Sequence, residues 1–287
     1  MDHSEPLMRV LVTGARGRLG SAIVREFSRD ADVRPLDRRT LDITDASAVA
    51  RTVEQIHPDV IINCAAFNDV DGAQDRVVEA LGVNALAVLA LSQAAQGIGC
   101  RLIHYSTDFV FDGEADAPYT EADLPSPRSS YGLSKLLGEW FALEGVRPYV
   151  LRVESLFGYA AERRGSFDAI LANVRQGLEV PVFVDRTVSP SYTVDVARAT
   201  RALIERDITP GLYHCVNSGA VTWKGIAEEV ARLLDRPLRI KPLTLESAGL
   251  KAPRPRFCAM SNAKLAAAGI VMPDWKDALA RYLSSPA

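Results

Sequence analysis

The sequence predicts an α/β protein built on a doubly wound parallel sheet, with a smaller C-terminal lobe. Between Arg9 and Leu151, short β-branched runs alternate with segments of helical periodicity. The runs are apolar throughout, as expected of strands that helices cover on both faces. Beyond Gly158, repeated prolines break the chain into short pieces, which is typical of an irregular lobe.

The first half of the sheet can be followed element by element. Val10–Val12 predicts the first strand, and residues 19–27 place apolar side chains on one face of a helix. Val33–Leu36 predicts the second strand. Asp45 precedes a helical pattern and is expected to cap that helix. Val60–Ile62 predicts the third strand.

The second half alternates in the same way. Residues 80–95 form the most apolar longer stretch, but polar side chains interrupt it. It falls short of the roughly 18 clean residues of a membrane span, so we expect a buried helix. Residues 102–106 predict a fourth strand, 131–143 a helix and 149–151 a fifth strand. Later apolar periodicity predicts helices near residues 194–205, 226–234 and 275–283.

Composition narrows the class of protein. Of the 287 residues, 48% are hydrophobic and 24% charged, enough apolar content for a sizeable core. The net charge is -3 and no block of Lys or Arg occurs, so neither nucleic acid nor an anionic membrane is expected as a partner. The scattered cysteines and the lack of signal-peptide features in residues 1–7 predict a reduced, cytoplasmic protein.

A glycine-rich turn follows the first predicted strand and opens the first helix. It reads Thr13-Gly14-Ala15-Arg16-Gly17-Arg18-Leu19-Gly20. Glycines allow a tight turn and let a pyrophosphate approach the amides of the helix N-terminus, where the helix dipole favours an anion. The spacing is G-x-x-G-x-x-G rather than G-x-G-x-x-G, so the motif alone is weak evidence. The location of the turn, between the first predicted strand and the first helix, is the stronger indication of a dinucleotide site. A glycine turn without a ligand is the alternative.

The end of the second predicted strand bears on the choice of cofactor. Asp37, 23 positions after Gly14, is placed to bind the adenosine ribose hydroxyls, which indicates NAD. Arg38-Arg39 follows, and two arginines lie in the glycine turn, so guanidinium groups can surround a ribose 2′-phosphate. The arginines favour NADP, with NAD as the alternative. Asp42-Ile43 is expected beside the adenine, or else forms only a helix-entry turn.

A phenol and an ammonium lie four residues apart in Tyr131-Gly132-Leu133-Ser134-Lys135, on one face of the predicted helix. An ammonium stabilises phenolate, so we expect Lys135, with a cationic nicotinamide, to bring the pKa of Tyr131 from about 10 toward neutral. Such a pair arises by chance on many helices. Here it follows a strand ending in Ser106-Thr107, where a hydroxyl could bond a substrate carbonyl. We therefore expect an acid–base site.

These motifs assign roles to two units. Residues 8–158, with about 192–216, are the predicted Rossmann-type dinucleotide-binding domain. Residues of about 159–191 and 217–287 are the predicted substrate-binding lobe. The lobe is expected to close over the carboxyl edge of the sheet, where open α/β sheets bind ligands.

With these motifs in place, the chain resembles the extended short-chain dehydrogenase/reductase superfamily. Within it, the likeness is to dTDP-4-dehydrorhamnose reductases and related nucleotide-sugar 4-ketoreductases, and it runs nearly end to end. One match extends from His104 to Gly113, and its part from Tyr105 to Gly113 is the most specific. The other matches are Thr13–Gly20, Asn63-Cys64-Ala65-Ala66, Ser126-Pro127, Tyr131–Lys135 with Gly138-Glu139, Gly211-Leu212-Tyr213-His214 and Arg254-Pro255.

The resemblance implies an oxidoreductase that uses NADPH, or alternatively NADH, to reduce the 4-keto group of a nucleotide-linked 6-deoxyhexose. Tyr131 would protonate the reduced oxygen, Lys135 would bind the nicotinamide ribose, and Thr107 would orient the carbonyl. Further cofactor positions implied are Ala65, Ala66 and Asn84, and the substrate positions are Thr107, Asp108, Phe109 and Arg254. No metal site is predicted. Relatives are often dimers, so a homodimer is one expected arrangement.

The resemblance also separates the reductases from the dehydratases and epimerases of the same superfamily. Related dehydratases carry an acidic pair after the threonine, whereas Phe109 follows Asp108 here. Epimerases typically carry small residues after the serine, which disfavours them too. The substrate side departs from the family pattern at four positions, Glu154, Ser155, Val188 and Cys258. Acceptance of dTDP-4-dehydrorhamnose itself is therefore left open.

Two alternatives to the reductase stay open, a non-catalytic NADP-binding regulatory subunit and a nucleotide-sugar epimerase. Arg186, Arg254 and Arg256 are weighed about evenly as a pyrophosphate clamp and as solvent-exposed side chains, with Arg254 favoured. The three tryptophans are interpreted as packing residues. The histidines of the fold, His57, His104 and His214, lie in no metal or nucleophile motif and are interpreted as structural.

Overall fold

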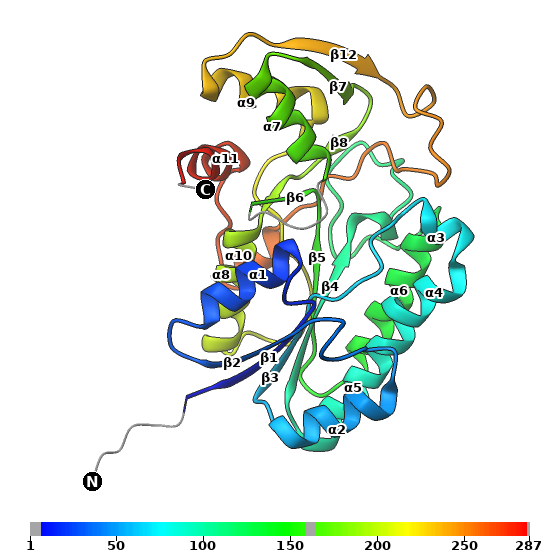
Figure 1. Ribbon diagram of the computed structural model, residues 1–287, viewed down its shortest axis with the longest axis vertical. Coiled ribbons are helices and arrows are strands. Elements are labelled where there is room, and N and C mark those ends of the chain that lie inside the picture. The colour runs from blue at the N-terminus through cyan, green and yellow to red at the C-terminus, as the bar shows by residue number, and fades with distance from the viewer. Residues whose placement is uncertain (1–6, 159–164, 286–287) are drawn as a thin grey trace.

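A computed structural model describes residues 7–158 and 165–285 (Figure 1). Its central sheet has six strands, all paired in parallel, in the order β10-β5-β4-β3-β1-β2. The strands are β1 (Arg9–Thr13), β2 (Asp32–Leu36), β3 (Val60–Asn63), β4 (Arg101–Thr107), β5 (Tyr149–Val153) and β10 (Gly211–His214). The five predicted strands and the α/β class are confirmed. The edge strand β10 was not predicted.

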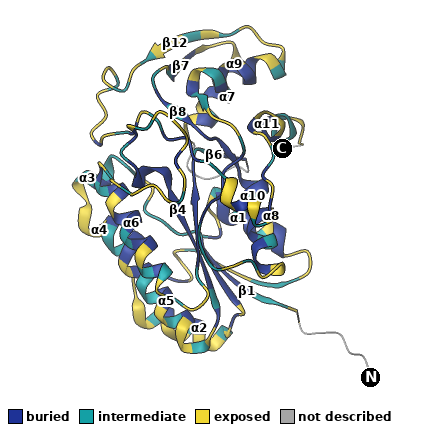
Figure 2. Cartoon of the chain, turned by 180° about the vertical axis from the view of Figure 1, so that it is seen from behind, coloured by how far each residue is buried: buried dark blue, intermediate teal, exposed yellow. Residues whose placement is uncertain are grey.

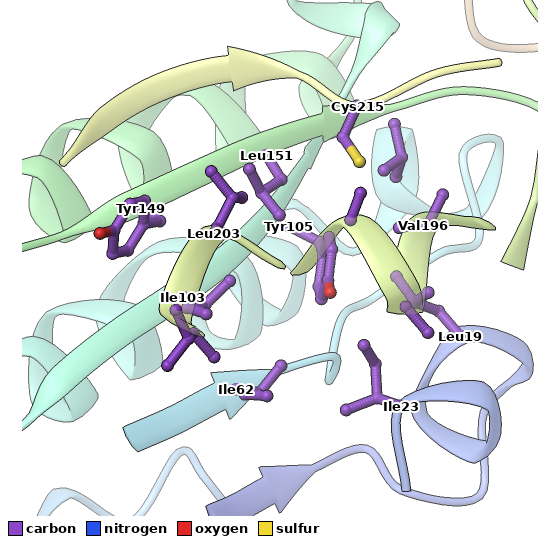
Figure 3. Close-up of a cluster of buried hydrophobic side chains, with 14 of the residues drawn as sticks. Leu19, Ile23, Ile62, Ile103, Tyr105, Tyr149, Leu151, Val196, Leu203 and Cys215 are labelled. Atoms are coloured by element: carbon purple, nitrogen blue, oxygen red, sulfur yellow. The ribbon is translucent and has the colours of Figure 1, made fainter. Parts of the chain in front are cut away.

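Helices cover both faces of the sheet (Figure 1). One face carries α1 (Arg18–Phe27) and α8 (Thr193–Glu205), and the other carries α2 (Ala46–Ile56), α5 (Ala87–Ile98) and α6 (Ser130–Leu143). On the first face, side chains of β3, β4 and β5 pack against those of α1 and α8 (Figure 3). Burial on both faces explains why the strand segments are apolar throughout.

Local side-chain bonds fix where two of these helices begin. Asp45 caps α2, since its Oδ1 accepts the Ala48 N–H at 2.9 Å, as predicted. Ser129 caps α6 in the same way, with its Oγ accepting the Gly132 N–H at 3.1 Å. Each cap satisfies an amide that the helix itself leaves without a partner.

The long apolar stretch is more varied than the sequence predicts. It comprises α4 (Val77–Leu81), a π-helical turn η1 (Gly82–Leu86) and α5. By length and composition alone, residues 77–98 could cross a membrane. One side of α5 packs into the core beneath the sheet. Leu86 is 58% exposed, so the prediction of a buried helix over residues 80–95 holds for one face only (Figure 2).

A smaller lobe stands above the carboxyl edge of the sheet (Figure 1). It contains α7 (Ser166–Gln176), α9 (Trp223–Leu234), α11 (Trp275–Ser284) and the two-stranded pairs β7 (Glu179–Phe183) with β12 (Arg239–Leu243) and β8 (Thr187–Val188) with β11 (Val221–Thr222). The three predicted later helices are confirmed as α8, α9 and α11. A separate apolar core holds this lobe together.

The chain does not divide cleanly at the predicted boundaries. The helix α10 (Ala263–Ala267) lies within the predicted lobe segment 217–287, yet Leu265, Ile270 and Met272 pack into the core of the sheet. Short strands β6 (Leu156–Phe157) and β9 (Ser191–Tyr192) pair where the chain passes between the two parts. The predicted boundary at 158/159 adjoins residues 159–164, which lie outside the described residues, as do residues 1–6 of the N-terminal segment.

Candidate active site

A cavity of about 1490 Å³ lies over the carboxyl edge of the sheet, between the sheet and the lobe. Sites for a single small ligand are usually roughly 300–1,000 Å³, so this cavity has room for a dinucleotide and a second ligand. It brings together Gly14, Arg16, Gly17, Arg18, Leu19, Asp37, Arg38, Asp42, Ile43, Ala65, Ala66, Thr107, Asp108, Phe109, Tyr131, Lys135 and Arg254. Of the predicted site residues, Gly20 and Asn84 do not line it.

The glycine turn is shaped as a backbone cradle. Gly14 has φ +64°, and a Cβ there would lie 2.6 Å from the Ala65 nitrogen. A Cβ on Gly20 would lie 2.2 Å from the Gly14 oxygen, so Gly20 shapes the turn from beneath. Gly17 is the N-cap of α1 and offers no side chain to its first amides. These features fit the pyrophosphate of a dinucleotide.

The predicted ribose carboxylate is already paired with arginines. Arg16 Nε lies 2.7 Å and Arg39 Nη2 3.6 Å from Asp37 Oδ2. Although desolvation acts against it, the backbone N–H groups of Arg39 and Thr40 and the arginine charges lower the pKa of Asp37. Arg38 lines the same end of the cavity. Positive charge therefore surrounds Asp37, which fits a ribose 2′-phosphate.

Arg18, also predicted at the cofactor, reaches across to the lobe. Its Nη1 lies 3.2 Å from Asp168 Oδ1 on α7, and Nη2 also contacts that carboxylate. The same Nη1 donates to the Gly158 oxygen at 3.3 Å. Arg18 thus joins the glycine turn to the lobe.

Asn84 stands on the π-helical turn behind the cavity wall. Its Oδ1 accepts the Phe67 N–H at 2.8 Å, while its Nδ2 donates to the Phe67 oxygen at 3.1 Å and to Ser134 Oγ at 2.9 Å. The residue therefore fixes the wall segment at Phe67 to the helix α6, between Tyr131 and Lys135.

Tyr131 and Lys135 are both buried on α6 and both line the cavity. Lys135 Nζ donates to the Tyr105 oxygen at 2.6 Å. Burial lowers the pKa of Lys135 to about 8, although the charge of Glu139 acts against it. In the protein itself, burial and the nearby Asp108 raise the pKa of the Tyr131 phenol, so the lowering expected with a cationic nicotinamide stays a prediction. Desolvation outweighs the hydrogen bond with Thr107, which acts to lower that pKa.

Beside the phenol, Thr107 and Asp108 start a buried polar chain. Thr107 Oγ1 donates to Asp108 Oδ1 at 2.8 Å, and Arg186 Nη2 donates to Asp108 Oδ2 at 3.3 Å. Burial raises the pKa of Asp108 in spite of Arg186. Arg186 and Arg254 both stack over the ring of Phe109, at 5.2 and 5.7 Å from its centroid.

Three arginines were considered in the sequence analysis as a clamp for the substrate pyrophosphate, and they differ in whether they line the cavity. Arg186 and Arg254 line the cavity, and Arg254 Nη2 also pairs with Asp71 at 3.0 Å. Arg256 is exposed and lies outside the lining. A pyrophosphate clamp therefore has two candidate members.

The substrate end contains polar groups that the sequence did not assign to the site. Glu154 Oε2 accepts the Ser189 N–H at 2.7 Å, but its buried Oε1 has no partner among the described residues. Arg186 Nε and Trp223 Nε1 are likewise buried without one. Burial, and then the charge of Asp108, raises the pKa of Glu154 well above its usual value. Glu154 was noted only as a departure from the family pattern, and Trp223 only as a packing residue.

Asp108, Glu154 and Cys258 offer ligand atoms within 4.8 Å of one another. Arg186 Nη2 lies 3.3 Å from Asp108 Oδ2 and 3.4 Å from Cys258 Sγ. A guanidinium therefore already supplies positive charge to this cluster. The positive charge of Arg186 therefore disfavours a metal cation at this cluster.

Comparisons with known proteins agree with this geometry. A family model described as "RmlD substrate binding domain" matches residues 8–286. The dTDP-4-dehydrorhamnose reductase of Mycobacterium tuberculosis (strain H37Rv) is 36% identical, covering 97% of this chain and 93% of that protein. The dTDP-4-dehydrorhamnose reductase of Bacillus anthracis, solved in complex with NADP, superposes with a TM-score of 0.91 at 31% identity, covering 96% of this chain and 99% of that one.

A third relative extends the agreement. The dTDP-4-dehydrorhamnose reductase of Clostridium acetobutylicum superposes with a TM-score of 0.90 at 32% identity, covering 96% of this chain and 98% of that one. The match is thus end to end in both sequence and structure. The chain belongs to the RmlD substrate binding domain family, the dTDP-4-dehydrorhamnose reductase-like branch of the extended short-chain dehydrogenases/reductases.

Proposed function

We propose that this protein reduces the 4-keto group of a dTDP-linked 6-deoxyhexose with NADPH, as a dTDP-4-dehydrorhamnose reductase. The observation that carries the proposal is the placement of Tyr131 and Lys135. Both are buried, and they line the same cavity as the glycine turn, Arg186 and Arg254. The full-length relatives that bear this name supply the substrate class.

The chain's own residues supply binding and proton transfer. A bound NADPH supplies the hydride. Tyr131 keeps its proton at neutral pH, because burial raises its pKa, so the phenol is ready to donate to a carbonyl oxygen that gains charge. The Lys135 ammonium stabilises the phenolate left behind. Thr107 lies next to the phenol and orients the carbonyl.

The cofactor end favours NADPH over NADH. Asp37 would repel a ribose 2′-phosphate if it stood alone, but Arg16 and Arg39 neutralise it. Arg38 adds a further guanidinium to the same wall. NADH remains a weaker alternative cofactor, since Asp37 can still accept from ribose hydroxyls.

The test is oxidation of NADPH and of NADH by the purified protein, with dTDP-4-keto-6-deoxysugars prepared with and without prior 3,5-epimerisation. Tyr131→Phe removes only the proton donor, so turnover is expected to fall at least about 10³-fold while NADPH affinity stays unchanged. Turnover retained in the variant would contradict the proposal. Tight NADPH binding without any turnover by the natural protein would favour the regulatory-subunit alternative.

The assembly and location of the protein are part of the same proposal. A homodimer would cover the apolar outer surface of α4 to α6, where Val78, Leu86, Leu133 and Trp140 are exposed. A cytoplasmic location fits the free cysteines of the described chain. Sedimentation equilibrium measures the assembly, and a mass of one chain at micromolar concentration would contradict a dimer.

A further inference from the structure

His104 lies between the wall of the cofactor site and the lysine of α6. Strand β4 places the side chains of Ile103 and Tyr105 in the core beneath α1 and α8 (Figure 3). Because side chains alternate along a strand, His104 points to the opposite face, toward α6. The ring is buried, with Nδ1 3.0 Å from Asn63 Nδ2 and Nε2 3.3 Å from Lys135 Nζ.

The orientation of the Asn63 amide is fixed from the other side. Asn63 Oδ1 lies 3.2 Å from the Ala65 nitrogen and 2.7 Å from Thr13 Oγ1. A hydroxyl can donate or accept, but the Ala65 N–H can only donate. The atom facing Ala65 must therefore be the amide oxygen, and the atom facing His104 must be the amide nitrogen.

This orientation dictates the tautomer of His104. The Asn63 amide nitrogen donates, so His104 Nδ1 must be the unprotonated, accepting nitrogen. Burial, and then the charge of Lys135, lowers the pKa of His104 well below its usual value, so the ring is neutral. A neutral ring that accepts at Nδ1 carries its hydrogen on Nε2. That N–H points at Lys135.

We propose that His104 is a positioning residue that sets the proton equilibrium of Lys135 by presenting an N–H, rather than a lone pair, to the lysine nitrogen. An ammonium has only donors, so Nε2–H opposes it, whereas the lone pair of a neutral amine can accept from Nε2–H. The Tyr105 oxygen accepts one lysine hydrogen at 2.6 Å in either state. The inference rests on the function proposed for Lys135 above.

Other groups around the lysine do not replace this effect. Glu139, on α6, favours the ammonium, but Arg152 holds it by two bonds of 2.8 and 2.7 Å. Burial raises the pKa of the Cys64 thiol, which is therefore neutral beside the lysine. Tyr131 is also neutral. Among these described groups, His104 is thus the one that disfavours the charged form of Lys135, with its Nε2 at 3.3 Å from Lys135 Nζ.

The proposal predicts an upper limit to the pH range of activity. The pKa of Lys135 lies below its usual value, at about 8, so the ammonium is lost as pH rises through that value. The phenolate then loses its stabilising charge, and kcat/KM falls. Without the opposing N–H, the ammonium survives to higher pH.

His104→Asn is the main variant. An asparagine oxygen takes the place of Nδ1 and keeps the bond from Asn63, but nothing replaces Nε2–H. The high-pH limb of kcat/KM is expected to move up by about one unit. His104→Gln serves if the first variant does not fold, because its amide oxygen can accept from the ammonium. His214→Gln is the control: His214 is equally buried, on β10, outside the cavity lining.

Two NMR measurements keep this test separate from that of the proposed function. The 15N shifts of the His104 ring report its tautomer, and the titration of labelled lysine reports the pKa of Lys135, one of six lysines, without any turnover. The proposal expects an Nε2–H tautomer at pH 7 and a lysine pKa that rises in His104→Asn and stays unchanged in His214→Gln. An Nδ1–H tautomer, or an unchanged lysine pKa in both His104 variants, would overturn it.

Discussion

The two ends of the cavity differ in how far their polar groups are already bonded within the protein. At the cofactor end, Thr13 bonds Asn63, Asn63 donates to His104, and Lys135 donates to the Tyr105 oxygen. At the substrate end, three side chains have buried atoms without a partner in the part of the chain that the structure describes, those of Glu154, Arg186 and Trp223. Ser106 Oγ, at the boundary between the two, has none either.

This difference indicates which end is organised in advance. An unpartnered buried polar atom costs roughly 1–3 kcal/mol, and a ligand that supplies the partner recovers that cost. The polar groups of the cofactor end are bonded before any ligand arrives, whereas the substrate end has buried atoms to which a ligand could supply the partner. Departures from the family pattern are also found at the substrate end, at Glu154 and Ser155. We therefore expect the backbone fold to determine cofactor recognition and a few side chains to determine the choice of substrate.

The largest expected effect tests the rigidity of the cofactor end. Gly14→Ala places a Cβ 2.6 Å from the Ala65 nitrogen at a residue with φ +64°. We expect a loss of about 3 kcal/mol in the free energy of unfolding and no measurable NADPH binding. Thermal unfolding and a fluorescence titration with NADPH measure both.

Gly177→Ala is the matched control for that variant. Gly177 has φ +67°, nearly the same backbone conformation, but no atom of residues 7–158 or 165–285 lies within 4 Å of the added Cβ. We expect a loss of about 1 kcal/mol with unchanged NADPH binding. Equal losses in the free energy of unfolding from the two variants would show that the glycine turn is not closely packed. They would also contradict the difference drawn between the two ends of the cavity.

A second, smaller effect tests the link between the two ends. Asp168→Asn removes the charge that faces Arg18 and an acceptor that also receives the Gly165 N–H at 2.7 Å. The paired side chains are 12% and 17% exposed, so we expect a loss of about 2 kcal/mol in chemical denaturation. Glu114→Gln breaks a pair that is 51% and 71% exposed and should cost under about 0.5 kcal/mol. Similar values for both variants would contradict a link through Arg18.

The smallest effect concerns the substrate end. The folded protein raises the pKa of Glu154 above its usual value, so the natural protein loses stability as pH rises above about 4.5. Glu154→Gln resembles the protonated acid and removes that loss. At pH 8 we expect the variant to be more stable by about 1 kcal/mol, with no difference near pH 4.

Glu228→Gln, at an exposed position of α9, provides the control and should show no pH-dependent difference. Denaturant unfolding at the two pH values measures both variants. NADPH affinity should stay the same in Glu154→Gln. A variant less stable than the natural protein at pH 8 would mean that Glu154 is ionised and paired.

The cofactor end could also be predicted from the sequence more completely than the substrate end. The glycine turn, Asp37 and the Tyr131–Lys135 pair are local patterns, and the structure gathers them as expected. Glu154 and Trp223 meet at the cavity only because the lobe folds back over the sheet, which no local pattern records. The raised pKa of Tyr131 depends on burial, which spacing along a helix does not report.

His104 shows the limit most directly. Its function follows from a tautomer, and the tautomer follows from Asn63 and Ala65, which are distant in sequence. Read as a residue on an apolar strand, it was interpreted as structural. The π-helical turn at Gly82–Leu86 was also beyond reach, because nearly every residue of the stretch is apolar and the shift of face that the turn causes leaves no pattern.

The interleaving of the chain between sheet and lobe has a consequence for how the protein can be made and dissected. After β5 the chain enters the lobe and then returns to supply α8 and β10, so Val196 and Leu203 reach the core only late in synthesis. A fragment ending at residue 158 would leave the apolar face of α1 open to water and β5 as a bare edge strand. Both are routes to aggregation, and such long-range closure also slows folding. The two parts are therefore one unit of expression, and neither can be excised as a working domain.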